Sequence, residues 1–482
     1  MKTIHVIGGG LSGSEAAAQC LHLGHKVVLH EMRPVKQTPA HSSGDFAEVV
    51  CSNSFKSEIE DSASGLLKRE MDALDSIILK GARATRVPAG HALAFDRKLF
   101  SEWITTTLRS HPNLTVVSEE VTEIPNEAEL TARSEAWIIA TGPLTSDALA
   151  ASLQTITGGK DRLFFYDAIA PTILAESIDM TKGFYASRYG NGTDDYLNLP
   201  FNKPEYEAFI DACIVAEKMP LHDFENTVYF EGCLPIEVMI ERGRDTLRFG
   251  PMKPVGLTDP NTGHRPWANL QLRIENRERT MYSMVGFQTK MKWPDQKRVF
   301  SMVPGLENAE FVRFGSIHRN TYVKSPEVLA SDLSFKGNRR VFLAGQLTGV
   351  EGYVESSALG ILAARHAGAV VCGQTWTSPP KESMLGALAD YVTLGGTGSF
   401  QPMNANLGLF PAEPKCKGES KEQRRAKQCA KARLAFDNWY GDQFQNPQTS
   451  AFSMTAKSFG LSEAPPTNAP SMLGLANSDA AF

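Results

Sequence analysis

The sequence predicts an α/β protein that has a Rossmann-like nucleotide-binding domain and an inserted domain of mixed α and β structure. The nucleotide-binding domain is predicted because a strand, a glycine turn and a helix follow one another near the N-terminus and again at residues 339–368. The inserted domain is predicted for the region of about 180 to 325. Its strand-like stretches "NTVYFEG" and "TMYSMVGFQT" are separated by Pro and Gly turns.

The first stretch, "KTIHVIGGGLSGSEAAAQCLHLGHKVVLHE", has the pattern of a complete βαβ unit. Its glycines fit the G-x-G-x-x-G motif, which provides a tight turn, room for a pyrophosphate and close packing of the helix on the strand. Glu31 ends the second strand about 20 residues later, where a carboxylate accepts hydrogen bonds from a ribose. The predicted cofactor-binding residues here are Gly8, Gly9, Gly10, Leu11, Ser12, Gly13 and Glu31.

Two later glycine turns are predicted to contact the same cofactor. "AWIIATGPLTSD" is an apolar strand that ends at Gly142, where a nucleotide can lie close to the backbone. "RRVFLAGQLTGVEGYVESSALGILAARHAG" is a strand followed by two glycines and a helix. The candidates in it are Gly345, Gln346, Gly352 and Tyr353, whose ring is a candidate for stacking on the cofactor or for core packing.

This arrangement brings the two ends of the chain into one domain. We expect residues 1–180 and 326–400 to form its two parts, and residues 181–325 to form the inserted domain, which carries the substrate or RNA site. Residues 401–482 are expected to form a basic helical segment, in "KCKGESKEQRRAKQCAKAR", and then a flexible tail.

Composition limits the classes of function. The chain has 482 residues, a net charge of −5 and no apolar segment long enough to cross a membrane, and its N-terminus has the pattern of a strand and not that of a signal peptide. We therefore expect a cytoplasmic enzyme of several domains. Its seven cysteines show no CxxC spacing, which argues against a disulfide framework, a zinc site and a CxxC redox centre.

A basic stretch interrupts this acidic chain. Residues 242–298 hold 12 Lys and Arg side chains against 5 Asp and Glu, and aromatic residues lie among them. Such a stretch suits phosphates and stacked bases, although a solvated face with core aromatics has the same composition. The predicted phosphate contacts are Arg242, Arg244, Arg248, Lys253 and Arg265.

Five blocks together carry a family resemblance: "GGGLSGSEAA", "EMRPVKQTPAH", "FAEVVCSNSF", "FEGCLPIEVMIERGRDTLRFGPMKPVGL" and "LAGQLTGVEGYVESSALG". They resemble the folate- and FAD-dependent tRNA (uracil-5-)-methyltransferases, in order, from residue 1 to about 410. The resemblance implies FAD in the first βαβ site, methylenetetrahydrofolate as one-carbon donor, NAD(P)H as reductant and the T-loop uridine of tRNA as acceptor. It also implies that FAD carries the methylene and that NAD(P)H supplies the hydride.

Uracil C5 attacks an electrophilic carbon once a thiolate has added to C6, and a second group must then remove the C5 proton. Cys51 and Cys233 lie in blocks that match the family, which uses two cysteines in catalysis. Cys51 is assigned as the nucleophile and Cys233 as the group that manages the C5 proton, although the sequence leaves open which thiol has which part. Taken without the resemblance, Cys51 also fits a buried structural thiol. Cys20, Cys213 and Cys372 lie in apolar helical patterns and are predicted to be core residues.

Other functions remain compatible with the residues. The same chemistry on ribosomal RNA is one alternative, an FAD-dependent NAD(P)H oxidoreductase of a small molecule is a second, and a nucleotide-sensing RNA-binding protein is a third. No metal site is predicted.

Overall fold

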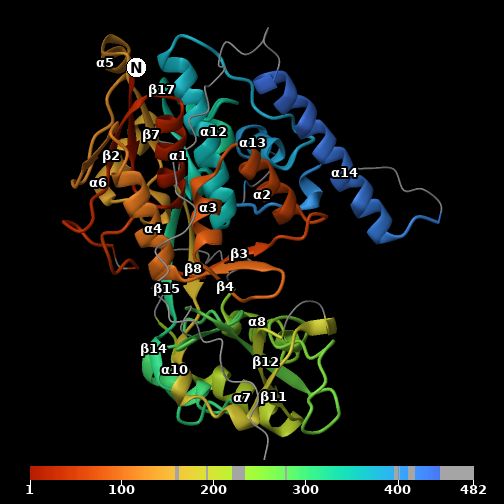
Figure 1. Cartoon of the computed structure of the whole chain (residues 1–482). Helices are drawn as coiled ribbons and strands as arrows, with labels where there is room; N and C mark the ends of the chain where they lie inside the picture. Colours follow the sequence, from red (N-terminus) through yellow and green to blue (C-terminus); the bar gives the residue numbers. More distant parts are fainter. Residues whose placement is uncertain are drawn as a thin grey trace, which may run out of the picture.

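The computed structural model describes residues 1–38, 40–157, 162–190, 194–219, 234–276, 279–395, 400, 402–410 and 418–445. The chain forms two lobes, and the antiparallel pair β8 (Arg162–Ile169) and β15 (Ser316–Val323) runs between them. Figure 1 shows the lobe built from the chain's two ends above this pair and the inserted lobe below it.

The first lobe contains a six-stranded sheet in the order β16-β17-β7-β1-β2-β6. The strands β17, β7, β1, β2 and β6 are parallel, and only the edge strand β16 is antiparallel to its neighbour. This order confirms a Rossmann-like sheet in which a late segment of the chain lies beside the N-terminal strands. Their bounds are β1 Thr3–Ile7, β2 Lys26–His30, β6 Leu114–Val117, β7 Ala136–Ile139, β16 Ser334–Phe335 and β17 Asn338–Leu343.

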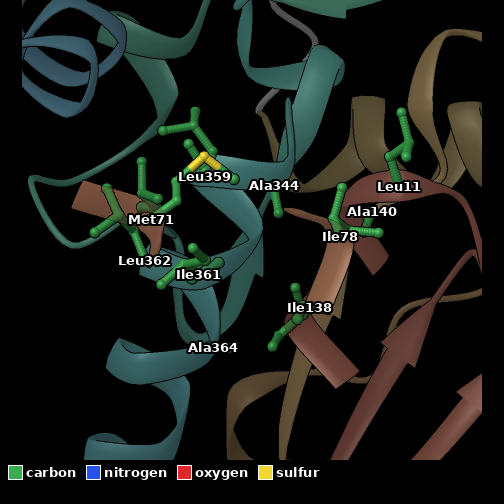
Figure 2. Packing of buried hydrophobic residues seen from close by; sticks show 14 of the residues in the cluster. Leu11, Met71, Ile78, Ile138, Ala140, Ala344, Leu359, Ile361, Leu362 and Ala364 are labelled. Atoms are coloured by element: carbon green, nitrogen blue, oxygen red, sulfur yellow. The ribbon is translucent and has the colours of Figure 1, made fainter. Parts of the chain in front are cut away.

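Two helices with small side chains pack side by side next to this sheet. They are α1 (Leu11–His22) and α12 (Tyr353–Val371), and nearly every residue of each is buried. Gly360 allows the close approach, because a Cβ there would lie 2.4 Å from the Ser12 carbonyl oxygen. Figure 2 shows Leu359 and Leu362 of α12 beside Met71, in a core that also includes β7.

A smaller sheet, in the order β3-β5-β4, lies between the lobes with three helices nearby. Side chains cap all three helix starts: Ser62 and Ser76 each accept a hydrogen bond at the starts of α2 and α3, and Asp96 accepts two at the start of α4. The strand β3 begins directly after residues 50–53, which we call the Cys51 segment. This sheet therefore anchors one side of that segment. The bounds are β3 Ser54–Ser57, β4 Arg86–Val87, β5 Ala92–Phe95, α2 Ala63–Ala73, α3 Ile77–Ala84 and α4 Arg97–Arg109.

The inserted lobe has its own sheet, in the order β10-β11-β12-β13-β9-β14, and its own core. All described pairs in this sheet are antiparallel, which agrees with the turn-rich sequence. Its first strand in the chain, β9, precedes residue 180, so we propose that the inserted domain begins at the β8–β15 pair. The bounds are β9 Thr172–Leu174, β10 Phe184–Tyr185, β11 Tyr196–Phe201, β12 Ala268–Ile274, β13 Met281–Met284, β14 Phe311–Arg313, α7 Lys203–Val215, α8 Ile236–Glu241, α9 Thr246–Phe249 and α10 Trp293–Phe300.

The last described helix, α14 (Lys421–Tyr440), starts with a capping box at Ser420. Its residues Cys429, Phe436 and Trp439 are buried against the first lobe. The predicted flexible tail lies outside the described residues. The remaining helices are α5 Glu127–Arg133, α6 Asp147–Ile156, α11 Ser325–Val328 and α13 Met384–Leu394.

None of the described helices is long and apolar enough to span a membrane. The prediction that Cys372 is a core residue is wrong, because Cys372 is exposed at the C-terminal end of α12, where the chain leaves the helix. Cys20 and Cys213 are buried, as predicted.

Candidate active site

A cavity lies at the carboxyl ends of β1, β2 and β7 and reaches the start of α12, with a volume of about 1230 Å³ when the open space at its mouth is included. This is the edge of a parallel sheet where nucleotides bind. Eight of the predicted cofactor-binding residues line the cavity: Gly8, Gly10, Leu11, Ser12, Glu31, Gly142, Gln346 and Tyr353. The other four do not line it: Gly9, Gly13, Gly345 and Gly352.

The glycines of the first turn have different structural roles. Gly8 has a φ of +100°, and a Cβ on Gly13 would lie 1.8 Å from the Gly8 carbonyl oxygen, so the turn itself requires both glycines. A Cβ on Gly10 would meet no protein atom within 4 Å, so its bare backbone leaves open space beside the start of α1. Oγ of Ser12 is buried there and has no hydrogen-bond partner among the described residues. This cradle fits a pyrophosphate at the N-terminus of α1.

Glu31 is held by the protein at both carboxylate oxygens. Oε2 accepts a hydrogen bond from the Gly9 amide at 2.8 Å, and Arg33 donates to both oxygens at 3.0 and 3.1 Å. Burial raises the pKa of Glu31, but the hydrogen bonds and charge of Arg33 outweigh it and lower the pKa below its ordinary value. Glu31 is therefore a fixed anion that also closes the glycine turn. Arg33 was not predicted as a residue of the site, although it lies two residues after Glu31, in the stretch "EMRP".

The later glycines shape the far side of the cavity. Gly345 has a φ of +73°, and a Cβ there would lie 2.7 Å from Cβ of Ser12, so this turn packs on the start of α1. Gly352 has a φ of +111° and is the N-cap residue of α12. Both glycines thus place the N-terminus of α12, and Tyr353 with it, beside the first glycine turn. Gly142 also has a positive φ and faces open space.

Cys51 and Tyr353 meet at one end of the cavity. Sγ of Cys51 lies 2.7 Å from Oη of Tyr353, and the backbone amides of Val50, Cys51 and Ser52 donate to the same oxygen at 3.1, 2.7 and 3.3 Å. Burial, followed by the neighbouring Cys51, raises the pKa of Tyr353 well above its ordinary value, so the phenol is neutral. The structure therefore brings the predicted nucleophile to the predicted cofactor site.

The residues that surround Cys51 come from the local sequence and from distant parts of the chain, and only the distant ones had no signal in the sequence. Asn53 is fully buried and donates to the carbonyl oxygens of Phe95, Ile274 and Glu275, which ties the segment to both lobes. Three arginines and one glutamate also surround the segment: Arg97, Arg273, Arg313 and Glu275.

The second predicted catalytic thiol, Cys233, lies outside the described residues. Burial raises the pKa of the thiols of Cys20 and Cys213, which makes both poor nucleophiles. Among the described residues, no cluster of His, Cys, Asp and Glu side chains fits a metal ion.

The five predicted phosphate contacts lie on the α8–α9 region of the inserted lobe and the loop that follows it. They differ in what they contact. Arg265 is exposed, whereas Arg244 forms an ion pair with Asp211 at 2.6 Å. The guanidinium of Arg248 lies 3.7 Å from the centre of the Trp267 ring, and its Nε donates to the Trp267 carbonyl oxygen. Arg248 therefore has a structural role. Lys253 is half-buried, and Arg242 is the C-cap residue that follows α8.

Comparisons with known proteins agree with this geometry. Residues 3–375 match the family described as GIDA, Glucose inhibited division protein A. The chain is 53% identical over 438 residues to the Methylenetetrahydrofolate--tRNA-(uracil-5-)-methyltransferase TrmFO of Geobacter sulfurreducens, covering 90% of this chain and 98% of that protein. It is 51% identical over 438 residues to the protein of the same name from Aquifex aeolicus, with 91% and 96% coverage.

Among solved structures, the form II crystal of Aquifex aeolicus GidA superimposes with a TM-score of 0.64 at 17% identity, covering 91% of this chain and 73% of that one. This likeness shows a shared fold. Because the two TrmFO proteins match nearly from end to end at more than half identity, the chain belongs to the methylenetetrahydrofolate–tRNA-(uracil-5-)-methyltransferase family.

Proposed function

We propose that this chain methylates C5 of the T-loop uridine of tRNA to give ribothymidine, with methylenetetrahydrofolate as one-carbon donor and NAD(P)H as reductant. One observation carries the proposal: Cys51, a partly exposed thiol, lines the same cavity as the dinucleotide-type glycine turn. A thiol at this place can add to C6 of a uracil that enters the cavity, and the addition makes C5 nucleophilic.

FAD fits the cavity. The open space at Gly10, the unpartnered Ser12 hydroxyl and the α1 N-terminus suit its pyrophosphate, and the fixed anion Glu31 lies where a ribose would bind. When bound, FAD supplies the transient carriage of the one-carbon unit and the redox chemistry that leaves a methyl group.

The protein's own groups hold and protect the reacting thiol. The neutral Tyr353 phenol fixes the backbone of residues 50–52 through three amide hydrogen bonds, so the Cys51 side chain is held at the cavity wall. We propose Cys233 as the group that removes the C5 proton, because it lies in a block that resembles the family's second cysteine block.

We propose that tRNA binds to the inserted lobe. We also propose that the protein acts in the cytoplasm, where tRNA is modified. Arg265 is exposed, whereas Arg248 is stacked on Trp267. Substitution of Arg265 therefore tests tRNA binding, and substitution of Arg248 tests the stability of the fold. We expect Arg265→Ala to reduce the slope of log affinity for tRNA against log salt by about 1. Arg248→Ala should instead lower the free energy of unfolding by about 1 kcal/mol, the scale of a cation–π contact. Filter binding at several salt concentrations and thermal melts measure the two effects. An unchanged salt slope for Arg265→Ala would remove that residue from the RNA surface.

The test of the function is nucleoside analysis after incubation of the purified protein with unmodified tRNA, NAD(P)H and methylenetetrahydrofolate labelled in its one-carbon unit. We expect label in ribothymidine from tRNA and none from the Cys51→Ala variant. Ribosomal RNA in a parallel reaction tests the acceptor. Label in ribosomal RNA alone, or NAD(P)H oxidation without label in any RNA, would overturn the proposal.

A further inference from the structure

Three half-buried arginines converge on the backbone that carries Cys51. Arg97 donates from Nη1 to the Val50 carbonyl oxygen at 3.0 Å, and Arg313 donates from its own Nη1 to the same oxygen at 2.7 Å. On the other side of the cysteine, Arg273 donates to the Ser52 hydroxyl at 3.1 Å. The residues before and after Cys51 are thus both held by guanidinium groups.

The arginines come from three separate elements. Arg97 begins α4 of the first lobe, Arg273 lies in β12, and Arg313 ends β14 of the inserted lobe. The Cys51 segment therefore lies where the lobes meet, and its electrostatic environment is made by both of them.

These cations outnumber the carboxylates that contact them. Glu275 accepts two hydrogen bonds from Arg97, at 3.0 and 2.8 Å, and its side chain is only 3% exposed. Within the part of the chain that the structure describes, no second carboxylate bonds to Arg273 or Arg313. Nε of Arg273 and both Nε and Nη2 of Arg313 are buried without a hydrogen-bond partner in that same part. Three guanidinium groups against one hydrogen-bonded carboxylate leave an excess of positive charge beside the Cys51 backbone. Arg97, Glu275 and Arg313 line a pocket there, and its lining also includes Asp96 and Glu102.

The three guanidinium groups contact the residues on either side of the thiol. Burial and the neighbouring Arg97 lower the pKa of Arg313 to about 10, which still leaves its guanidinium charged at neutral pH. Burial is the largest influence on the pKa of each of the three arginines. A negative charge on Cys51 is a smaller influence that raises each pKa, so each arginine is within electrostatic reach of the sulfur. Tyr353, on α12, contacts Cys51 directly, and its phenol is neutral.

We propose that Arg97, Arg273 and Arg313 are positioning residues that hold Cys51 as a thiolate, and that Glu275 limits the strength of their field. Positive charge beside a cysteine favours the thiolate, which is the nucleophilic form. This inference rests on the proposed function only in taking Cys51 as the reacting thiol.

Removal of a cation and removal of the anion from this cluster should shift the pKa of the Cys51 thiol in opposite directions. Arg273→Gln removes a cation, and we expect it to raise the pKa of the thiol by about 1 unit. Glu275→Gln removes the opposing anion, and it should lower the pKa of the thiol by a similar amount. If the cluster only stabilised the local structure, Arg273→Gln and Glu275→Gln would shift the pKa of the Cys51 thiol in the same direction.

The pKa is measured from the pH dependence of Cys51 alkylation by iodoacetamide in the flavin-loaded protein, with the Cys51 peptide quantified by mass spectrometry. Arg273→Lys keeps the charge and should restore the wild-type value, so the Arg273 pair decides the question even if Glu275→Gln does not fold. Lys98→Gln is the matched control, because Lys98 follows Arg97 on α4 but its side chain is 84% exposed. The pKa of the Cys51 thiol in Lys98→Gln should equal that in the wild type.

Shifts of the same sign, no shift in Arg273→Gln, or no alkylation of Cys51 between about pH 5 and 10 would each overturn the inference. The two proposals fail separately. Opposite shifts together with normal methyl transfer by Cys51→Ala would leave the arginine cluster in place and remove Cys51 from the reaction.

Discussion

Cys51→Ala is expected to lower methyl transfer to tRNA by roughly 10³-fold or more, the scale of loss that follows removal of an enzyme nucleophile. The bound FAD should be retained, because the glycine turn that fits the pyrophosphate is formed by other residues of the cavity lining. The amides of residues 50–52 that hold Tyr353 remain after the substitution. Single-turnover transfer of labelled one-carbon units and the visible absorbance of the flavin measure the two properties on one sample.

Cys372→Ala is the matched control, because Cys372 is an exposed thiol at the end of α12 and does not line the cavity. It should methylate tRNA at the wild-type rate. Turnover by Cys51→Ala within tenfold of the wild type would exclude Cys51 as the nucleophile, whatever the state of the flavin.

Gly10→Ala is expected to reduce flavin occupancy at least tenfold while leaving the flavin-free protein as stable as the wild type. Gly10 has φ −69° and ψ −169°, which alanine also adopts, and the added Cβ meets no protein atom within 4 Å. The space it enters is the space assigned to the pyrophosphate. A clash that costs about 1.4 kcal/mol reduces affinity tenfold. The absorbance ratio at flavin and protein wavelengths gives the occupancy, and thermal melts of the flavin-free protein give the stability.

Two further glycine variants define what this result means. Gly13→Ala should destabilise the fold itself, because its Cβ would lie 1.8 Å from the Gly8 carbonyl oxygen. Gly337→Ala lies in the short turn between β16 and β17 with its nearest neighbour at 3.5 Å, so it should change neither property. Full flavin occupancy in Gly10→Ala would mean that the pyrophosphate binds elsewhere.

The nucleotide-binding part of this protein was predictable because its signals are local. Strand, turn and helix follow one another within about 30 residues, and the G-x-G-x-x-G spacing is set by steric limits that act between near neighbours. The position of β17 in the same sheet was predictable for a related reason. A second apolar strand that is followed by a glycine turn and a helix can bury its side chains by pairing within the first sheet.

The environment of Cys51 was not predictable in this way. The sequence identified Cys51 by its family block, but Arg97, Arg273, Glu275 and Arg313 reach it from positions 46 to 262 residues away along the chain. None of them stands out in the sequence, because an arginine on a strand or at a helix start is more often a solvated side chain. Composition left the basic stretch 242–298 open between an RNA-facing surface and a solvated face with core aromatics, and the structure divides it between exposed, stacked and half-buried arginines.

The sequence by itself therefore determined the fold class, because strands, glycine turns and helices follow one another at short and regular spacing. It predicted the nucleotide cradle in the same way, and it predicted the reacting thiol through its family block. Only the tertiary structure decided which charges surround that thiol. Coulomb interactions depend on distance and burial in three dimensions, and both are set by the packing of the inserted lobe against the first.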